Sequence, residues 1–119
     1  MTNEREKVMG TGLSKKEQLG LEKFRTALEK ALGKNLVEVK LFGSKARGDA
    51  RKDSDIDVLV IIATGDLRVR DVIYVLVTDI LLEEEVDISP KVIDKKKYTH
   101  LLKIRTPFIK NIIRDGITV

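Results

Sequence analysis

The sequence has no cysteine, no tryptophan, two prolines and a single histidine, His100. The absence of cysteine excludes disulfides, thiolate zinc sites and cysteine nucleophiles, and one histidine cannot build a histidine metal cluster. Aromatic residues make up only 4% of the chain, which is too few for a platform that stacks single-stranded bases. These absences leave oxygen atoms as the ligands for any metal chemistry.

Long apolar runs are also missing. No run approaches the roughly 18 residues that a membrane span requires, and residues 1–13 are polar and charged rather than signal-like. We therefore expect a cytoplasmic protein with no membrane partner. Leu, Val and Ile are nonetheless abundant, which predicts one globular domain over residues 14–119 that follows a flexible N-terminal tail at residues 1–13.

Charge is distributed unevenly along the chain. The formal net charge is +4, but residues 1–52 and 91–119 each carry +6, whereas residues 53–90 carry −8. An acidic centre between two basic flanks is typical of a cation site beside an anion site, as metal-dependent chemistry on a nucleotide requires. It is less typical of a uniform surface for duplex nucleic acid.

The first half of the chain predicts a helix and then a strand. Ser14 is placed as an N-cap, and Glu17 completes a capping box before apolar residues at helical spacing that extend to about residue 33. Alternation of apolar and polar residues predicts a strand at residues 36–42. Residues 45–54 are polar and charged, which predicts a short helical turn and a surface loop.

The second half predicts two more strands and two helices. Residues 55–63 form a continuous β-branched run, which is typical of a central strand buried on both faces. Residues 67–82 fit both alternating and helical spacing, and their length favours a helix. The remaining predicted elements are a strand at 85–93 that Pro90 places at a sheet edge or a bulge, a basic loop at Lys95–Lys97, and a terminal helix capped by Thr106. This order predicts an α/β (α+β) fold with a small mixed sheet and flanking helices.

The stretch from Leu41 to Val60 carries the candidate chemistry. Asp55 and Asp57 are two residues apart on a predicted strand, so their side chains leave the same face with α-carbons roughly 6–7 Å apart. A bound divalent cation would relieve the repulsion between the two carboxylates. Upstream, Gly43 lets a phosphate approach the backbone, and the Ser44 hydroxyl and nearby amides can donate hydrogen bonds to it. Arg47 is well spaced to contact a triphosphate with both arms of its guanidinium.

These residues resemble a known family. Gly43-Ser44, a ten-residue gap and Asp55-Ile56-Asp57-Val58 are similar to the signature of the DNA polymerase β-type nucleotidyltransferases. The wider stretch GSKARGDARKDSDIDVLV looks most like the minimal nucleotidyltransferases, the MNT branch, which includes antitoxins. The resemblance extends over about residues 14–119 and implies the polymerase β-like nucleotidyltransferase fold. Asp87 matches the family's third carboxylate, and Glu85 takes that role if the register differs by two residues.

The resemblance implies a role for each residue. Asp55, Asp57 and Asp87 would be the catalytic carboxylates and would bind two Mg²⁺ ions, whereas Gly43, Ser44 and Arg47 would bind ATP. The reaction would transfer AMP from ATP to an acceptor hydroxyl and release pyrophosphate. MNT proteins are commonly encoded beside a HEPN-domain ribonuclease toxin and adenylylate a tyrosine of that toxin. The resemblance therefore implies that a HEPN-domain protein encoded nearby is the partner.

Two other functions are open at this stage. The chain could be a binding module that neutralises a partner by stoichiometric contact, with little or no catalysis. It could also transfer nucleotides to a small molecule or to RNA with the help of a second subunit. A length of 119 residues favours a protein acceptor, because small-molecule enzymes of this superfamily use a second domain or subunit to build the substrate pocket. Nucleic acid is therefore not the favoured partner.

Overall fold

A computed structural model describes residues 11–48 and 54–119 of the chain. The elements follow one another in the order α2 (Lys15–Leu32), the 3-10 turn η1 (Gly33–Asn35), β1 (Leu36–Phe42), α3 (Gly43–Arg47), β2 (Ile56–Ile62), α4 (Leu67–Glu84), β3 (Ile88–Asp94), α5 (Lys95–Ile104), α6 (Pro107–Asp115) and β4 (Ile117–Thr118).

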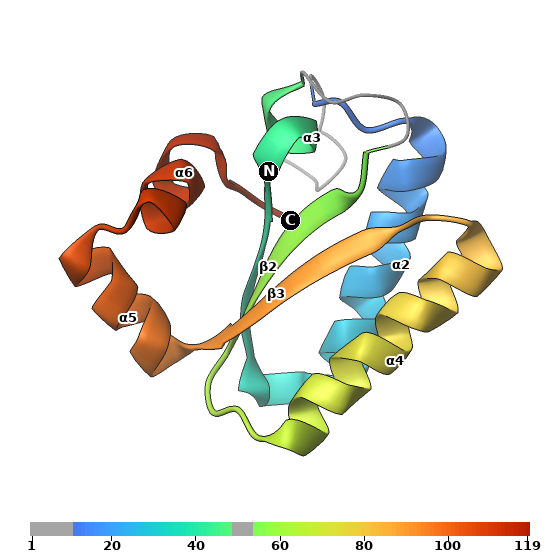
Figure 1. The fold of residues 1–119 in the computed structure, drawn as a ribbon. Coiled ribbons are helices and arrows are strands. Elements are labelled where there is room, and N and C mark those ends of the chain that lie inside the picture. The colour runs from blue at the N-terminus through green and yellow to red at the C-terminus, as the bar shows by residue number, and fades with distance from the viewer. Residues whose placement is uncertain (1–10, 49–53) are drawn as a thin grey trace, which may run out of the picture.

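The strands in the described part of the chain form one mixed sheet with the order β3-β2-β1-β4. Strands β2 and β3 are parallel, whereas β1 is antiparallel to both β2 and β4. Helices α2 and α4 cover one face of the sheet, and α5 and α6 cover part of the other (Figure 1). The predicted α/β (α+β) class with a small mixed sheet is confirmed.

Local signals placed the starts of three helices correctly. Ser14 and Glu17 form the predicted capping box at the start of α2. Thr106 caps α6, and Pro107 occupies its first turn, where a missing N–H costs nothing. The ambiguous stretch is helical, and the Asp66 side chain caps it by accepting from the Val69 amide.

Three predictions about the second half need correction. The strand predicted at 85–93 runs from Ile88 to Asp94, because α4 continues through Glu84. Lys95–Lys97 is not a loop but the first turn of α5, because the Asp94 carboxylate accepts from the Lys97 amide at 2.7 Å and caps the helix. The predicted order also lacked the short strand β4, which pairs with β1 at the outer edge of the sheet.

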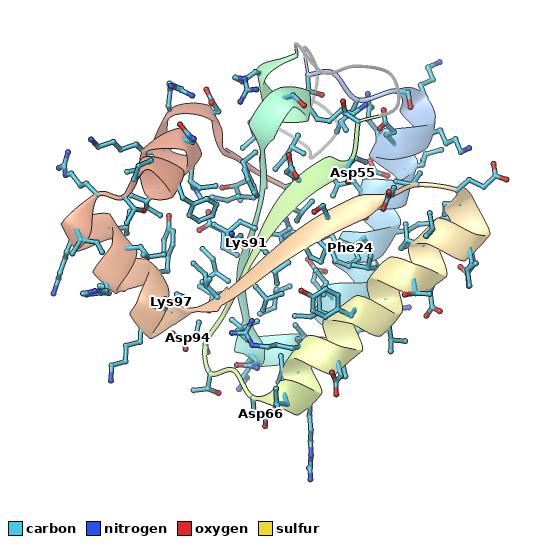
Figure 2. The ribbon with its side chains drawn as sticks, viewed as in Figure 1. Phe24, Asp55, Asp66, Lys91, Asp94 and Lys97 are labelled. Carbon is cyan, nitrogen blue, oxygen red and sulfur yellow. The ribbon has the colours of Figure 1, made fainter. Side chains whose placement is uncertain are left out.

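The sheet separates two apolar cores. Alternate residues of β2 enter the core under α2 and α4, whereas Leu59 and Ile61 enter the core under α5 and α6. Phe24 of α2 is fully buried in the first core (Figure 2). The prediction of a central strand buried on both faces is confirmed, and this alternation decides which way the polar residues at the start of β2 point.

Two features of the periphery bear on function. Most of the predicted tail lies outside the described residues. Among residues 11–13, which are described, Leu13 is buried in the core with 7% exposure. Strand β3 lies at the sheet edge, as Pro90 predicted. On its outer side Pro90 has no N–H, and the Val92 carbonyl accepts a hydrogen bond from Arg70 at 2.8 Å.

None of the described helices combines the length and apolar character needed to cross a bilayer.

Candidate active site

Strand topology brings the candidate residues to one edge of the sheet. Strand β1 ends where the antiparallel β2 begins, so Gly43 lies near the start of β2. Strand β3 is parallel to β2 and therefore begins at the same edge, where the Ile56 amide donates to the Asp87 carbonyl at 3.0 Å. Segments separated by more than forty residues in the sequence thus meet at the edge where Figure 2 labels Asp55.

The side chain of Asp57 points to the face that α5 and α6 partly cover. It continues the row formed by Leu59 and Ile61, which pack under those helices. On β3, Ser89 is the residue paired with Asp57, and on β1 it is Phe42. Asp57 therefore lies where the apolar core under α5 and α6 ends and the polar edge begins.

The three predicted aspartates are close enough to influence one another. Partial burial and then the charge of Asp55 raise the pKa of Asp57, whereas the charge of Arg47 lowers it. Loss of water, together with hydrogen bonding to Asp55 and its charge, raises the pKa of Asp87. Asp55 is thus the neighbour of both other carboxyls, and the structure brings all three predicted carboxylates together.

Glycine is required at position 43 by two independent constraints. Its φ of 74° lies in the left-handed region, and a Cβ built there would overlap the Asp57 Oδ2 atom and lie 3.2 Å from its Cγ. The backbone of the turn therefore lies directly against the carboxylate. Ser44 follows in the first turn of α3.

Arg47 lies between two acidic groups. Its charge acts on Asp57, and its Nη1 lies 3.7 Å from the Asp115 carboxylate at the end of α6. Asp115 also accepts from Arg114 at 2.9 Å, and the guanidinium of Arg114, followed by the charge of Arg47, holds the pKa of Asp115 below its usual range. No local pattern singles out Asp115, because its contact with Arg47 joins residues that are almost seventy positions apart.

The position of Asp87 is fixed by contacts just before it. Val86 is buried against α2, where Gly20 leaves room for its side chain. Glu85, the alternative third carboxylate, points to Lys16 with a 3.0 Å ion pair and is 81% exposed. This hydrogen bond and the charge of Lys16 lower the pKa of Glu85. The placement therefore favours Asp87 over Glu85 as the third carboxylate.

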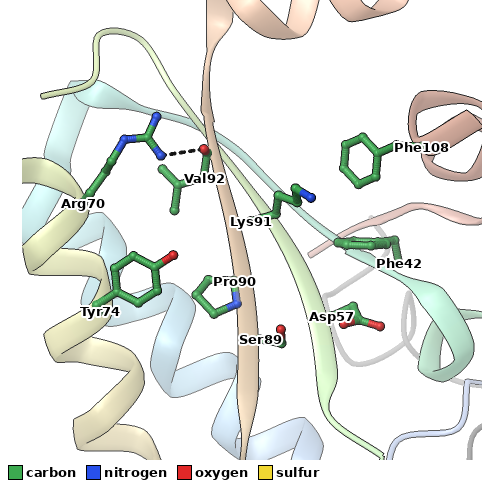
Figure 3. A pocket seen from close by; sticks show the side chains of 9 residues that line it. All are labelled: Phe42, Asp57, Arg70, Tyr74, Ser89, Pro90, Lys91, Val92 and Phe108. Carbon is green, nitrogen blue, oxygen red and sulfur yellow. Dashed lines mark hydrogen bonds between the residues drawn. The ribbon is translucent and has the colours of Figure 1, made fainter. Parts of the chain in front are cut away.

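A hollow of about 520 Å³ extends from Asp57 along β3 (Figure 3). Phe42 and Phe108 lie on the same side of the strand as Asp57, with ring centroids 5.6 Å apart in an edge-to-face arrangement. The Lys91 ammonium lies 5.0 Å from the centre of the Phe108 ring. No role for these residues can be predicted from the sequence, because nothing in the local pattern shows that β1, β3 and α6 line the same hollow.

The donor set fits a hard divalent cation, although the side chains are not arranged as a finished site. In residues 11–48 and 54–119, no three His, Cys, Asp or Glu side chains stand in an arrangement that could hold a metal ion. The carboxylates are nevertheless neighbours: burial and then the interaction with Asp55 raise the pKa values of Asp57 and Asp87, and a cation would relieve the repulsion. The chemistry of the ligands therefore supports the metal prediction, which stays a prediction.

Comparison with known proteins places the chain in a family. The profile of the Nucleotidyltransferase domain matches residues 21–117. Two proteins of Methanocaldococcus jannaschii, named "Putative protein adenylyltransferase MJ0604" and "Putative protein adenylyltransferase MJ0141", are each 32% identical over 100 residues. The matches cover 84% and 83% of this chain and 94% of each relative. The chain belongs to the nucleotidyltransferase domain family, and its activity class is nucleotidyl transfer.

Solved structures confirm the fold. A toxin–antitoxin complex with AMP-PNP contains a chain that matches with a TM-score of 0.51 and 22% identity, over 82% of this chain and 70% of the other. A complex of the tri-AMPylated HEPN toxin of Shewanella oneidensis with its MNT antitoxin matches with a TM-score of 0.52 and 22% identity, over 86% and 70%. These likenesses establish the polymerase β-like nucleotidyltransferase fold and agree with the resemblance seen in the sequence.

Proposed function

We propose that this nucleotidyltransferase transfers AMP from ATP to a hydroxyl of a protein partner, and that this partner is a HEPN-type toxin that the transfer neutralises. One observation carries the proposal: Gly43, Arg47 and three aspartates, which come from three separate segments of the chain, meet at one edge of the sheet. The relatives named protein adenylyltransferases support a protein acceptor. The tyrosine acceptor and the cytoplasmic location extend the same proposal.

Each side of the site would handle one part of the substrate. The Gly43–Ser44 turn and Arg47 would hold the triphosphate, because amides, a hydroxyl and a guanidinium all donate to phosphate oxygens. Asp55, Asp57 and Asp87 would hold Mg²⁺, which supplies charge neutralisation and orients the phosphates when bound. The site would thus neutralise both the triphosphate and the pyrophosphate that leaves.

The transfer exchanges a phosphoanhydride bond of ATP for a phosphoester bond to the acceptor. The acceptor oxygen forms a bond to the α-phosphorus while the bond from that phosphorus to the bridging oxygen breaks, and pyrophosphate departs. The acceptor proton would pass to Asp87, whose raised pKa makes it a better base than an ordinary aspartate. The hollow beside Asp57 would receive the side chain that carries the acceptor hydroxyl.

The test uses the full chain and, as the proposed partner, a HEPN-type protein sought in the reading frames beside its gene. Both purified proteins are incubated with ATP and Mg²⁺, and the intact mass of the HEPN protein is measured for the addition of AMP. Asp57→Asn provides the inactive comparison, and the ribonuclease activity of the HEPN protein is assayed in parallel. AMP addition and loss of ribonuclease activity that both depend on Asp57 would support the proposal.

The same experiment decides between transfer and masking. Neutralisation that survives Asp57→Asn without any AMP addition would show that the chain acts by stoichiometric contact. AMP incorporated into RNA or a small molecule, but not into protein, would instead show a different acceptor. Each of these results would contradict the proposed function.

A further inference from the structure

Helix α3 carries a buried charge that the proposed chemistry does not use. Lys45 follows Gly43 by two residues, and its side chain is 2% exposed. It is the one buried charged side chain among the residues that the structure describes. A buried cation is costly unless it is paired and hydrogen-bonded, so its surroundings must compensate for the loss of water.

Glu17 of α2 provides that compensation. The Lys45 Nζ lies 2.9 Å from Glu17 Oε2 and donates to Oε1 at 3.1 Å. The Glu17 carboxylate also accepts from the Ser14 amide at 3.0 Å as part of the capping box. The Glu17 carboxylate therefore caps the start of α2 and also binds Lys45 of α3, so it links the two helices.

The backbone of α3 is joined to the same region. The Gly12 amide donates to the Lys45 carbonyl at 2.7 Å, and the neighbouring Leu13 is buried in the core. A helix of five residues has little stability of its own, because forming the first turn orders several residues for a single hydrogen bond. Its orientation must therefore come from such tertiary contacts.

We propose that Lys45 and Glu17 are positioning residues for nucleotidyl transfer. Their buried ion pair fixes the direction in which α3 presents Gly43 and Ser44 to the nucleotide. The role in transfer rests on the proposed function, whereas the fixing of α3 rests on the contacts alone. An apolar pair would fill the same space with similar stability. Hydrogen bonds between charged groups, however, define one orientation of α3 relative to α2, whereas an apolar contact lets the two helices slide.

The test compares variants that remove the charges without removing the capping box. Glu17→Gln keeps an acceptor for the Ser14 amide and loses the charge. Lys45→Met keeps an unbranched side chain that is one atom shorter, and the double variant leaves no unpaired charge at this contact. Lys30→Met removes an exposed lysine from the last turn of α2 and serves as the control.

Two measurements are made on each variant. Hydrogen exchange reports the opening of residues 43–48 relative to α4, and titration with AMP-PNP and Mg²⁺ reports nucleotide affinity. We expect hydrogen exchange at residues 43–48 to be faster than in the wild type in both single variants and in the double variant. In the double variant, exchange in α4 should be unchanged. We also expect nucleotide affinity to fall about tenfold, because a small misplacement of a binding group is costly. Lys30→Met should match the wild type.

Wild-type exchange and wild-type affinity in the double variant would overturn the proposal, because a pair without charges would then position α3 equally well. The double variant keeps the proposal falsifiable even if a single variant with one buried unpaired charge does not fold. If the wild-type chain failed to bind AMP-PNP, the proposed function would fail. The exchange of residues 43–48 would still decide whether the ion pair holds α3.

Discussion

The Gly43 backbone lies against the Asp57 carboxylate, so that the end of β1 and the start of β2 fit together only with glycine at position 43. This contact joins the two halves of the site, because the turn that would hold phosphate begins where the carboxylates are found. The proximity explains why a side chain at position 43 and a change at position 57 should have related effects on activity.

Gly43→Ala should abolish most activity and destabilise the fold. The new Cβ would displace the Asp57 side chain. The alanine would also have to adopt a φ of 74°, which costs about 1–2 kcal/mol for a residue other than glycine. Transfer activity should fall at least about 100-fold. Gly33→Ala is the matched control, because Gly33 has a φ of 53° but no atom within 4 Å of the added Cβ. It should show the loss of thermal stability without the loss of activity, and equal activity losses in both variants would contradict this account.

Neutralising Asp57 or Asp87 should remove activity and yet raise thermal stability. Both carboxyls have raised pKa values in the folded chain, so their charged forms are disfavoured by folding at neutral pH. Asp57→Asn and Asp87→Asn should each raise Tm in a metal-free buffer, which thermal melts of the three proteins would measure. Mg²⁺ should raise the Tm of the wild type more than that of either variant. A lower Tm in both variants without metal would show that the carboxylates do not repel each other.

The same pKa shifts predict how cation binding depends on pH. The unfolded pKa of aspartate is about 3.9, and the folded values of Asp57 and Asp87 lie above it. The stability of the metal-free chain should therefore fall as pH rises through these raised values, because the folded chain binds more protons in that range. Binding of Mn²⁺, followed by electron paramagnetic resonance, should increase over the same pH range. Mn²⁺ affinity that does not change between about pH 4 and 7 would exclude these carboxylates as ligands.

Asp115 should tune Arg47, the arginine proposed to hold the triphosphate. Asp115→Asn removes the carboxylate that pairs with Arg47 and should raise the KM for ATP about two- to fivefold with a smaller effect on kcat. The lowered pKa of Asp115 means that its contribution to stability is present above its unfolded value and is lost as pH falls through the folded value. Steady-state kinetics with Asp71→Asn, an exposed aspartate on α4, provide the comparison. Identical KM values in the two variants would remove Asp115 from this role.

Much of the architecture could be predicted because its signals are local. The capping box at Ser14 and Glu17 and the proline edge rule at Pro90 each depend on a few neighbouring residues. The aspartates at the start of β2 could likewise be identified from two-residue spacing. Helix α5 was missed because its cap, Asp94, ends a strand and three lysines resemble a solvated loop.

The contacts that organise the site could not be predicted because they join distant segments. Lys45 looks like one more charged residue in a polar stretch, and only the fold shows that it is buried against Glu17. Asp115 and Phe108 belong to a terminal helix whose position over the sheet is set by the packing of Ile109 and Ile112. Spacing along the chain indicates the chemical groups, whereas tertiary packing decides their neighbours.

The outer edge of β3 restricts how any partner can reach the carboxylates. With Pro90 lacking an amide hydrogen and Arg70 occupying the Val92 carbonyl, an extended peptide cannot pair along this edge as an additional strand. Main-chain pairing would accept many sequences and is thus a poor means of selecting one target. Under the proposed function, a protein acceptor would instead have to offer a folded surface that delivers its hydroxyl to Asp57. Selectivity for the acceptor is therefore expected to depend on the shape of the whole partner, and short peptides copied from it should be poor substrates.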